Sequence, residues 1–294
     1  MLNLKILEKK VQKYIQTHVG DKITELVLKG SPFNEIKNID IIEQIESKSR
    51  CKSKLPTWYN TPSILYPNKL NIEQCSSEKT AYYKSTLVSG ENLIDITAGF
   101  GVDSFYFSKK IKNIISCEVD KKLSEISEHN FKTFNTKNIR NKALNGLNFL
   151  EKTETIFDWI YIDPSRRGPD KKKKILIKDC NPDVSKHLNL FFKLSQNILI
   201  KLSPMVDIQA VIKDIVNPKK IHIVAVKNEV KEILVVLKKG FSGETTIKAI
   251  NLDSEQPNFE FKISNEKKLV LSYKPPEKYL SVSYTHLRAH ETGS

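Results

Sequence analysis

Residues 93–108 read LIDITAGFGVDSFYFS, and this stretch decides the fold. An apolar run ends in Asp95 and Thr97, passes through Gly99 and Gly101, and leads into an amphipathic stretch. Small residues at a strand-to-helix turn let the backbone approach a ligand at the carboxyl edge of a sheet. The pattern therefore predicts a buried strand, a ligand-binding turn and a helix.

The acidic residues around this turn indicate which ligand it binds. The third glycine of a GxGxxG dinucleotide fingerprint is missing, because position 104 is Ser. Asp95 and Asp103 would repel a pyrophosphate at the start of the helix, but they suit S-adenosylmethionine, which carries an ammonium and a sulfonium. Glu118 lies 19 residues after Gly99, at the end of the next predicted strand, where it can accept hydrogen bonds from two ribose hydroxyls. The alternative is a tight turn with ordinary acidic caps.

A further cofactor contact is predicted in residues 143–146, which read ALNG after a weak third strand. Asn145 can bond the amine of adenine from this position. An Asn-Gly turn that binds no ligand has the same sequence, so both interpretations stay open.

The order of elements predicts an α/β fold. Apolar residues recur at helical spacing over residues 1–50, and three prolines in residues 51–70 predict an extended linker. Apolar runs at 93–97, 114–119, 157–163, 198–203, 221–226 and 233–237 predict strands. Amphipathic stretches at 102–110, 121–134, 182–196 and 207–215 predict the intervening helices. Apolar strands without strict alternation are typical of a parallel sheet buried on both faces.

The last two strands break this alternation, because only residues 227–231 (KNEVK) separate them. Such a connection is too short for a crossover helix and predicts an antiparallel hairpin. A doubly wound parallel sheet that ends in an antiparallel hairpin resembles the Rossmann-like class I methyltransferase fold. We therefore expect a helical N-terminal domain at 1–60 and a class I methyltransferase domain at 61–240.

The chemistry is predicted at residues 157–167, FDWIYIDPSRR, where a strand ends in Asp163, Pro164, Ser165 and Arg166. This resembles the [DN]PP[YF] and DPP/AR signatures of nucleic-acid methyltransferases. In the first type, the acidic or amide side chain and a backbone carbonyl hold an exocyclic amine, and the aromatic ring stacks on the base. Arg166 stands at the aromatic position, from which an arginine can stack on a base or contact phosphate. Asp163 would orient the acceptor amine and take up or share its proton.

The second signature belongs to C5-pyrimidine methylation, which also needs a cysteine nucleophile after the fifth strand. Ser203 stands there, and its hydroxyl stays protonated near neutral pH. The C5 mechanism is therefore rejected.

The chain carries 48 Lys and Arg against 34 Asp and Glu, a formal net charge of +14. Residues 166–174 (RRGPDKKKK) concentrate part of this surplus directly after Asp163. They predict a phosphate-binding loop for RNA or DNA formed by Arg166, Arg167, Lys171, Lys172, Lys173 and Lys174. The alternative is a solvated lysine loop, since five of the basic residues are Arg and the rest Lys, as the codon usage of an AT-rich genome favours.

Composition narrows the remaining classes. No apolar run approaches the ~18–20 residues of a membrane span, and residues 1–10 contain no signal-peptide core. The four cysteines share no CxxC spacing, so neither a disulfide framework nor a metal site is indicated. We expect a cytoplasmic protein that binds neither membrane nor metal, and the sequence leaves its oligomeric state open.

Four segments together resemble the Bacteroidetes THUMP-like-domain methyltransferases: EQCSSEKTA at 73–81, DITAGFGVD at 95–103, DPSRR at 163–167 and LSPMVDI at 202–208. The resemblance implies a small helical N-terminal part, a class I methyltransferase domain and a C-terminal THUMP-like domain. It also implies S-adenosylmethionine binding and RNA modification. Thr80 and its neighbours would close over the cofactor, or else form a helix that packs on the sheet.

Under this resemblance, residues 241–280 begin a THUMP-like domain that the chain truncates. Residues 281–294, SVSYTHLRAHETGS, resemble read-through of a sequencing adapter and are expected to be non-native. A genuine short polar tail is the alternative.

The sequence thus predicts an S-adenosylmethionine-dependent methyltransferase that modifies a base nitrogen of RNA. A noncatalytic RNA-binding protein with a relic methyltransferase fold is one alternative. A methyltransferase for small molecules or proteins is another, and it predicts little dependence of activity on salt.

Overall fold

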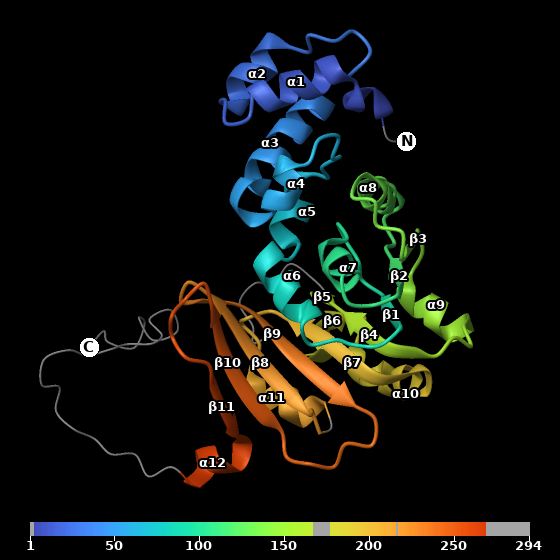
Figure 1. Cartoon of the computed structure of the whole chain (residues 1–294), viewed down its shortest axis with the longest axis vertical. Helices are drawn as coiled ribbons and strands as arrows, with labels where there is room; N and C mark the ends of the chain where they lie inside the picture. Colours follow the sequence, from blue (N-terminus) through green and yellow to red (C-terminus); the bar gives the residue numbers. More distant parts are fainter. Residues whose placement is uncertain (1–2, 167–176, 216, 269–294) are drawn as a thin grey trace, which may run out of the picture.

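Nine strands form one mixed sheet in the spatial order β11-β10-β8-β9-β7-β4-β1-β2-β3 (Figure 1). The fold is known from a computed structural model, which describes residues 3–166, 177–215 and 217–268. The strands are β1 (Asn92–Asp95), β2 (Asn113–Cys117), β3 (Ile139–Lys142), β4 (Phe157–Ile162), β7 (Ser195–Leu202), β8 (Lys220–Val226), β9 (Glu229–Lys238), β10 (Thr246–Leu252) and β11 (Phe259–Lys262).

The strands β3, β2, β1, β4 and β7 run parallel, as their apolar sequences predict. β8 and β9 pair antiparallel, in agreement with the hairpin predicted from the short connection. Lys227 and Asn228 at its turn have φ angles of 50° and 67°. Two successive left-handed residues match the right-handed twist of a hairpin. The predicted doubly wound α/β class is therefore confirmed.

Helices cover the two faces of the sheet with separate apolar clusters. α9 (Gly146–Lys152), α10 (Val184–Leu194) and α11 (Ile208–Asp214) pack on one face, through a cluster that includes Leu150, Phe191 and Val211. α6 (Glu78–Ser85) and α7 (Val102–Phe107) lie on the other face, where Phe107 packs with Trp159 and Tyr161. α8 (Lys121–Thr133) follows β2, and α12 (Ile263–Lys268) follows β11.

The helical N-terminal segment extends further along the chain than predicted. It contains η1 (Leu4–Leu7), α1 (Lys9–Thr17), α2 (Ile23–Lys29), α3 (Asn38–Lys54), α4 (Pro56–Asn60) and α5 (Lys69–Gln74). The prediction of an extended linker at 51–70 is wrong in part, because the end of α3, all of α4 and the start of α5 occupy it. Pro56 begins α4, a position that tolerates proline because the first helical N–H needs no partner within the helix.

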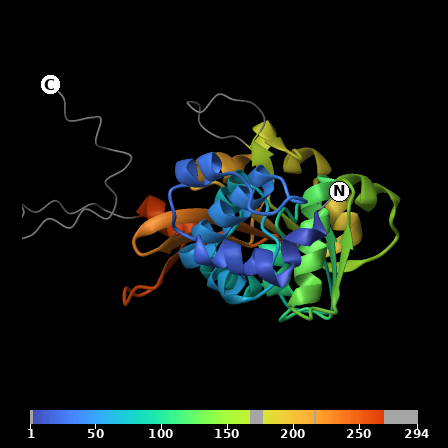
Figure 2. The same cartoon turned by 90° about the horizontal axis from the view of Figure 1, so that it is seen from above.

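This segment shares its core with the part of the chain that contains the sheet. Trp58 is buried, with ring centroids 5.0 Å from Phe105 of α7 and 4.9 Å from Phe134 at the end of α8. Viewed from above, the blue N-terminal helices lie in front of the sheet, between the orange strands and the green helices (Figure 2). Described residues before and after residue 60 thus belong to one apolar cluster, and the expected domain boundary there stays a prediction.

The expected boundary at residue 240 also falls inside a continuous structure. β10 pairs parallel with β8, and β11 pairs antiparallel with β10, so residues 246–262 extend the same sheet. The hairpin is thus internal to the sheet rather than terminal. Residues 269–294, with the expected non-native tail, lie outside the described residues, and a THUMP-like domain stays a prediction.

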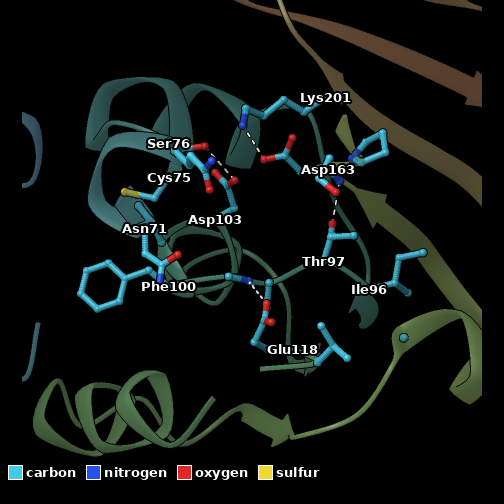
Figure 3. A pocket seen from close by; sticks show the side chains of 18 of the residues that line it. Asn71, Cys75, Ser76, Ile96, Thr97, Phe100, Asp103, Glu118, Asp163 and Lys201 are labelled. Carbon is cyan, nitrogen blue, oxygen red and sulfur yellow. Dashed lines mark hydrogen bonds and ion pairs between the residues drawn. The ribbon is translucent and has the colours of Figure 1, made fainter. Parts of the chain in front are cut away.

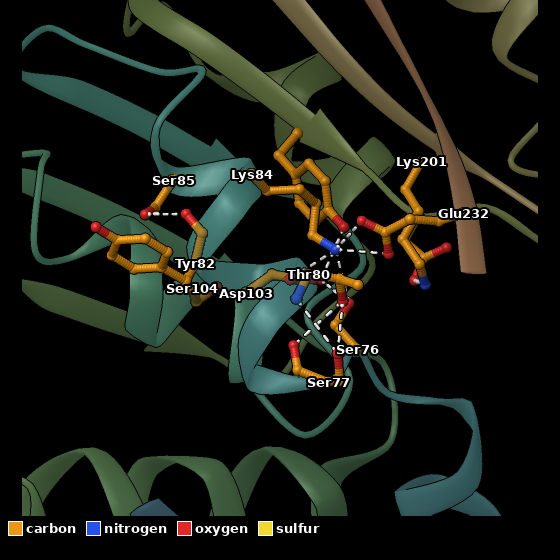
Figure 4. Close-up of polar contacts among 12 residues, drawn as sticks. Ser76, Ser77, Thr80, Tyr82, Lys84, Ser85, Asp103, Ser104, Lys201 and Glu232 are labelled. Atoms are coloured by element: carbon orange, nitrogen blue, oxygen red, sulfur yellow. Dashed lines mark hydrogen bonds and ion pairs between the residues drawn. The ribbon is translucent and has the colours of Figure 1, made fainter. Parts of the chain in front are cut away.

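A buried ammonium group connects α6 to the sheet. Lys84 has no exposed side-chain surface, and its Nζ donates to Glu232 of β9 at 2.8 and 2.9 Å and to Ser76 Oγ at 2.9 Å. The same Nζ lies 3.2 Å from Asp103 Oδ1 of α7 (Figure 4). We call Lys84, Glu232, Asp103 and Ser76 the Lys84 network.

Lys84→Met is expected to destabilise the protein by about 3–5 kcal/mol, because it removes the ammonium group that donates to both oxygens of the buried Glu232 carboxylate. Lys79→Met on the same helix is the matched control. Lys79 pairs with Asp253 at the surface, so its loss is expected to cost at most about 1 kcal/mol. Urea unfolding measures both free energies, and equal effects of the two substitutions would contradict the role given to the Lys84 network.

Candidate cofactor and acceptor site

A pocket of about 1040 Å³ opens at the carboxyl edge of the parallel strands (Figure 3). Its lining comes from the ends of β1, β2, β4 and β7, from the start of α9 and from residues 71–76 of the helical segment. In the sheet, β1 lies between β2 and β4. The β1–α7 turn is therefore flanked by Glu118 after β2 on one side and Asp163 after β4 on the other.

The two glycines of the turn are required for different reasons. Gly99 and Gly101 have φ angles of 56° and 79°, the left-handed region that favours glycine. A Cβ at Gly101 would lie 2.5 Å from the ring of Phe131, whereas one at Gly99 would meet no atom within 4 Å. Gly101 thus lets α8 pack closely, and Gly99 leaves open space on the pocket side of the turn.

Glu118 is held rigidly beside this turn. Its Oε2 accepts from the N–H of Gly99 and its Oε1 from the N–H of Asp120, both at 2.8 Å. Each carboxylate oxygen has further acceptor capacity, so the oriented side chain can still receive two hydroxyls. Glu118 lines the pocket beside this turn, and its contact with the ribose stays a prediction.

Asp103 lines the pocket from the first turn of α7. Its Oδ2 accepts from Ser76 Oγ at 2.8 Å and from the Tyr161 hydroxyl at 2.7 Å. Burial alone would raise its pKa, but Lys84 and Lys201 together with these hydrogen bonds hold the pKa of Asp103 below its ordinary value. Its Oδ1 lies 3.2 Å from Lys84 Nζ, and among the described residues no hydrogen bond reaches it. An ionised, buried acceptor therefore borders the pocket.

Asp95 lies elsewhere than its predicted role requires. It is fully buried beneath the turn and is absent from the pocket lining. Its Oδ2 accepts from Ser104 Oγ at 2.6 Å and its Oδ1 from the Thr97 N–H at 3.1 Å. Burial raises the pKa of Asp95 to about 8. Asp95 thus positions the turn from below, and Ser104, which replaces the third glycine of a dinucleotide fingerprint, is its partner.

Asn145 borders the pocket at the start of α9. Its Oδ1 caps the helix by accepting from the N–H groups of Leu147 at 2.9 Å and Asn148 at 3.2 Å. The adenine amine is itself a donor and would compete for this oxygen. The amide nitrogen of Asn145 can instead donate to a ring nitrogen of adenine. The contact with adenine therefore stays a prediction, with Asn145 as the donor rather than the acceptor.

Asp163 lies across the pocket from Glu118 (Figure 3). Its backbone N–H donates to Thr97 Oγ1 at 2.6 Å, and its Oδ2 is ion-paired with Lys201 at the end of β7. Burial alone would lower the pKa of Lys201, but the carboxylates of Asp163, Glu232 and Asp103 raise it above the ordinary lysine value. Thr97 therefore contributes by fixing the backbone of Asp163.

The rest of the predicted catalytic segment lies beside Asp163. Pro164 and Ser165 line the pocket. Ser165 and Arg166 form the short strand β5 (Ser165–Arg166), which pairs antiparallel with β6 (Cys180–Asn181) after the turn η2 (Ile177–Asp179). Arg167 and Lys171, Lys172, Lys173 and Lys174 lie outside the described residues, so their predicted contact with phosphate stays a prediction.

Several lining residues were missed by sequence reasoning. Val119 follows Glu118 and is 72% exposed at the pocket, where it forms an apolar surface beside the Glu118 carboxylate. Cys75 and Ser76 approach from the helical segment, whereas Thr80 is buried in α6 and does not line the pocket. Lys201 lies on a strand whose sequence shows no sign of its partner. Only Val119 carried a local signal, an apolar residue directly after a strand-ending carboxylate.

These residues fit S-adenosylmethionine. Glu118 offers acceptors to the ribose, Val119 offers an apolar face to the adenine, and the Asp103 carboxylate offers negative charge to the amino group. Open space at Gly99 lets the cofactor approach the backbone. Among the described residues, no group of three or more His, Cys, Asp and Glu side chains is arranged to hold a metal ion. No helix in that part of the chain has the length and apolarity needed to cross a membrane.

Comparison with known proteins shows which family this chain resembles. Residues 90–239 match the family described as RNA cap guanine-N2 methyltransferase. A crystal structure of a protein from Porphyromonas gingivalis W83, assigned as a methyltransferase, superposes with a TM-score of 0.81 and 26% identity over 94% of this chain and 69% of that one. An uncharacterized RNA methyltransferase of Mycoplasma mobile is 31% identical over 103 residues, or 31% of this chain and 28% of that protein. The chain thus spans little more than a quarter of that relative.

Together with the family match and the superposed structure, the doubly wound sheet and the pocket at its carboxyl edge identify the class I methyltransferase fold, whose cofactor is S-adenosylmethionine. The chain belongs to the RNA cap guanine-N2 methyltransferase family, whose match covers just over half of its residues.

Glu118→Gln is expected to weaken binding of S-adenosylhomocysteine by roughly 10- to 100-fold, because hydrogen bonds to a charged group each contribute about 1.5–3 kcal/mol. Isothermal titration calorimetry measures this affinity directly. Glu151→Gln, at an exposed position on α9, removes the same charge away from the pocket and should leave the affinity unchanged. Equal affinities of both variants and the wild type would rule out the ribose contact.

Asp95 should give a distinctive dependence of stability on pH. From about pH 4 to pH 8 the folded chain keeps a proton on Asp95 that the unfolded chain has released, so this group's contribution to stability falls as pH rises. Asp95→Asn cannot lose that proton. The difference in free energy of unfolding between this variant and the wild type should therefore shift in favour of the variant as pH rises. The shift should total roughly 2–4 kcal/mol between about pH 5 and pH 8, at about 1.4 kcal/mol per pH unit. Urea titrations at each pH test this, with the exposed Asp21→Asn as control, and parallel curves would refute it.

Proposed function

We propose that this chain transfers the methyl group of S-adenosylmethionine to a base nitrogen of RNA, with the exocyclic N2 of guanine as the first candidate. One observation carries the proposal: Asp163 and the cofactor residues around Gly99 face the same cavity, because β4 and β1 are neighbours in the sheet. The family description and the Mycoplasma mobile relative support RNA as the substrate class.

When bound, S-adenosylmethionine supplies an activated methyl group, because the sulfonium is a good leaving group. Asp163 then accepts an N–H of the exocyclic amine and so orients the nitrogen toward the methyl carbon. Thr97 and Lys201 hold Asp163 from two sides, one through its backbone and the other through its carboxylate. Alignment and exclusion of water are the main demands of such a transfer.

The nitrogen–carbon bond forms as the carbon–sulfur bond breaks, and the nitrogen then releases a proton. Asp163 is in place to receive this proton or pass it to water. Lys201 adds a donor beside this acceptor. A guanine presents its N1–H and N2–H donors next to its O6 acceptor, which complements a carboxylate beside an ammonium.

Asp163→Ala is expected to lower methyl transfer by at least about 100-fold, since it removes both the orienting contact and the proton acceptor. Binding of S-adenosylhomocysteine should change by less than about twofold, a change of about 0.4 kcal/mol. Tritiated S-adenosylmethionine with total RNA measures transfer, and Asp21→Ala at a remote exposed position is the control.

The outcomes separate the alternatives. Unchanged transfer by Asp163→Ala would overturn the acceptor assignment. Cofactor binding by the wild type without any transfer would favour a relic RNA-binding protein. Label in protein or in small molecules would favour the third class. Mass analysis of nucleosides from labelled RNA identifies the atom, and methylation of carbon or of ribose would contradict a base nitrogen.

A further inference from the structure

A second cavity, of about 750 Å³, lies toward the opposite end of the sheet from the cofactor pocket. Trp159 lines it from near the start of β4, whereas Asp163 follows the end of that strand. Tyr83 and the residues directly after α6 form one wall, and Phe241 and Gly243 of the β9–β10 connection form another.

The floor of this cavity consists of two polar rows that cross three strands. The strand registers place Lys220, Thr246 and Lys262 in one row and His222, Lys248 and Glu260 in the next. Intervening residues such as Ile221, Ile247 and Phe261 point to the other face, where they join the cluster beneath α11. A sheet face beside a well-packed core is therefore polar at these six positions.

Ammonium groups outnumber carboxylates at the cavity. Lys219, Lys220, Lys248 and Lys262 line it, and the acidic groups that face them are Glu244 and Glu260. Glu260 is shared, 2.8 Å from Lys220 and 4.0 Å from Lys248, and these two lysine side chains are only 30% and 28% exposed. Glu244 also accepts from the N–H of Ser264 at 2.5 Å. Four ammonium groups against two carboxylates leave this cavity with a surplus of positive charge, which suits an anion.

Aromatic groups adjoin these charges. The Tyr83 hydroxyl lies 2.7 Å from Nδ1 of the buried His222. Burial and the neighbouring Lys220 and Lys248 lower the pKa of His222 to about 4, so the imidazole is neutral near pH 7. Phe241 is half-buried at the rim and packs against Gly243. Basic side chains combined with aromatic surfaces are typical of sites for single-stranded nucleic acid.

We propose that this second cavity, the basic pocket, binds the phosphate backbone of the RNA substrate. Among the described residues, the basic pocket shares no lining residue with the cofactor pocket, so it would contact a part of the RNA remote from the methylated nucleotide. The inference rests on the proposed function only in taking RNA as the partner. An acidic protein segment is the competing occupant, and it would leave RNA binding insensitive to changes in the pocket.

The test measures binding of a fluorescein-labelled single-stranded RNA of about 20 nucleotides by the full chain at several salt concentrations. Each phosphate contact contributes about 0.7 to the slope of log K against log salt for single strands. Lys219→Gln with Lys262→Gln should therefore reduce the slope by roughly 1.4 and weaken binding several-fold. The matched control is Lys9→Gln with Lys13→Gln, at exposed positions on α1, which should leave the slope unchanged.

Glu260→Gln provides a test that structural damage cannot imitate. It frees Lys220 and Lys248 from their shared carboxylate, and RNA should bind at least about threefold more tightly with a steeper salt dependence. Unchanged or weaker binding by this variant, or equal loss in the pocket and control pairs, would overturn the inference. If the wild type methylates RNA but every pocket variant binds RNA as the wild type does, the role of the basic pocket is contradicted and the proposed function is not. Altered binding without any methyl transfer would instead sink the proposed function.

Discussion

A lysine ammonium that solvent does not reach determines how the two parts of this chain fit together. An isolated charge in that position would be too costly, so Lys84 must meet carboxylates, and Glu232 and Asp103 supply them from β9 and α7. Three elements distant in the sequence are thereby fixed against one another. Because Ser76 belongs to the same network, the segment before α6 is held over the β1–α7 turn, and the cofactor pocket gains the wall that a bare sheet edge would lack.

The same arrangement explains why two carboxylates close in sequence behave in opposite ways. Asp103 faces ammonium groups and hydroxyl donors, which keep its pKa low despite burial. Asp95 is buried with neutral partners, and its pKa rises to about 8. Both were predicted as anionic contacts for a cationic cofactor. In the structure the two residues have different positions and charges. Asp103 borders the pocket as an anion, whereas Asp95 supports the turn and is largely protonated at neutral pH.

Local sequence was sufficient to predict those features of the fold and the site that depend on a few neighbouring residues. Apolar runs gave the strands, the short KNEVK connection gave the hairpin, and the spacing of Gly99, Glu118 and Asp163 placed three groups that do meet at one edge. Prediction from local sequence failed for features that depend on contacts between residues distant in the sequence. Pro56 led to the prediction of a linker, because the local sequence does not show that Trp58 is buried. Likewise, no residue near Lys201 in the sequence indicates that its side chain would pair with Asp163. The extension of the sheet by β10 was likewise hidden, since pairing with β8 is a long-range choice.

The segment after β4 differs from the signature that it resembles, and under the proposed function this difference affects how RNA would bind. Arg166 stands where an aromatic ring would stack on the target base, and the neighbouring Asp163 carries an ion pair with Lys201. Under the proposed function, such a pair would select a base edge by charge and hydrogen bonding, but competition with water limits the affinity that a single nucleotide can gain. Under the proposed function, the remaining binding energy would come from contacts with the rest of the RNA. A chain with a large positive charge and a basic surface beyond α6 can supply it, because phosphate contacts add affinity without specifying sequence.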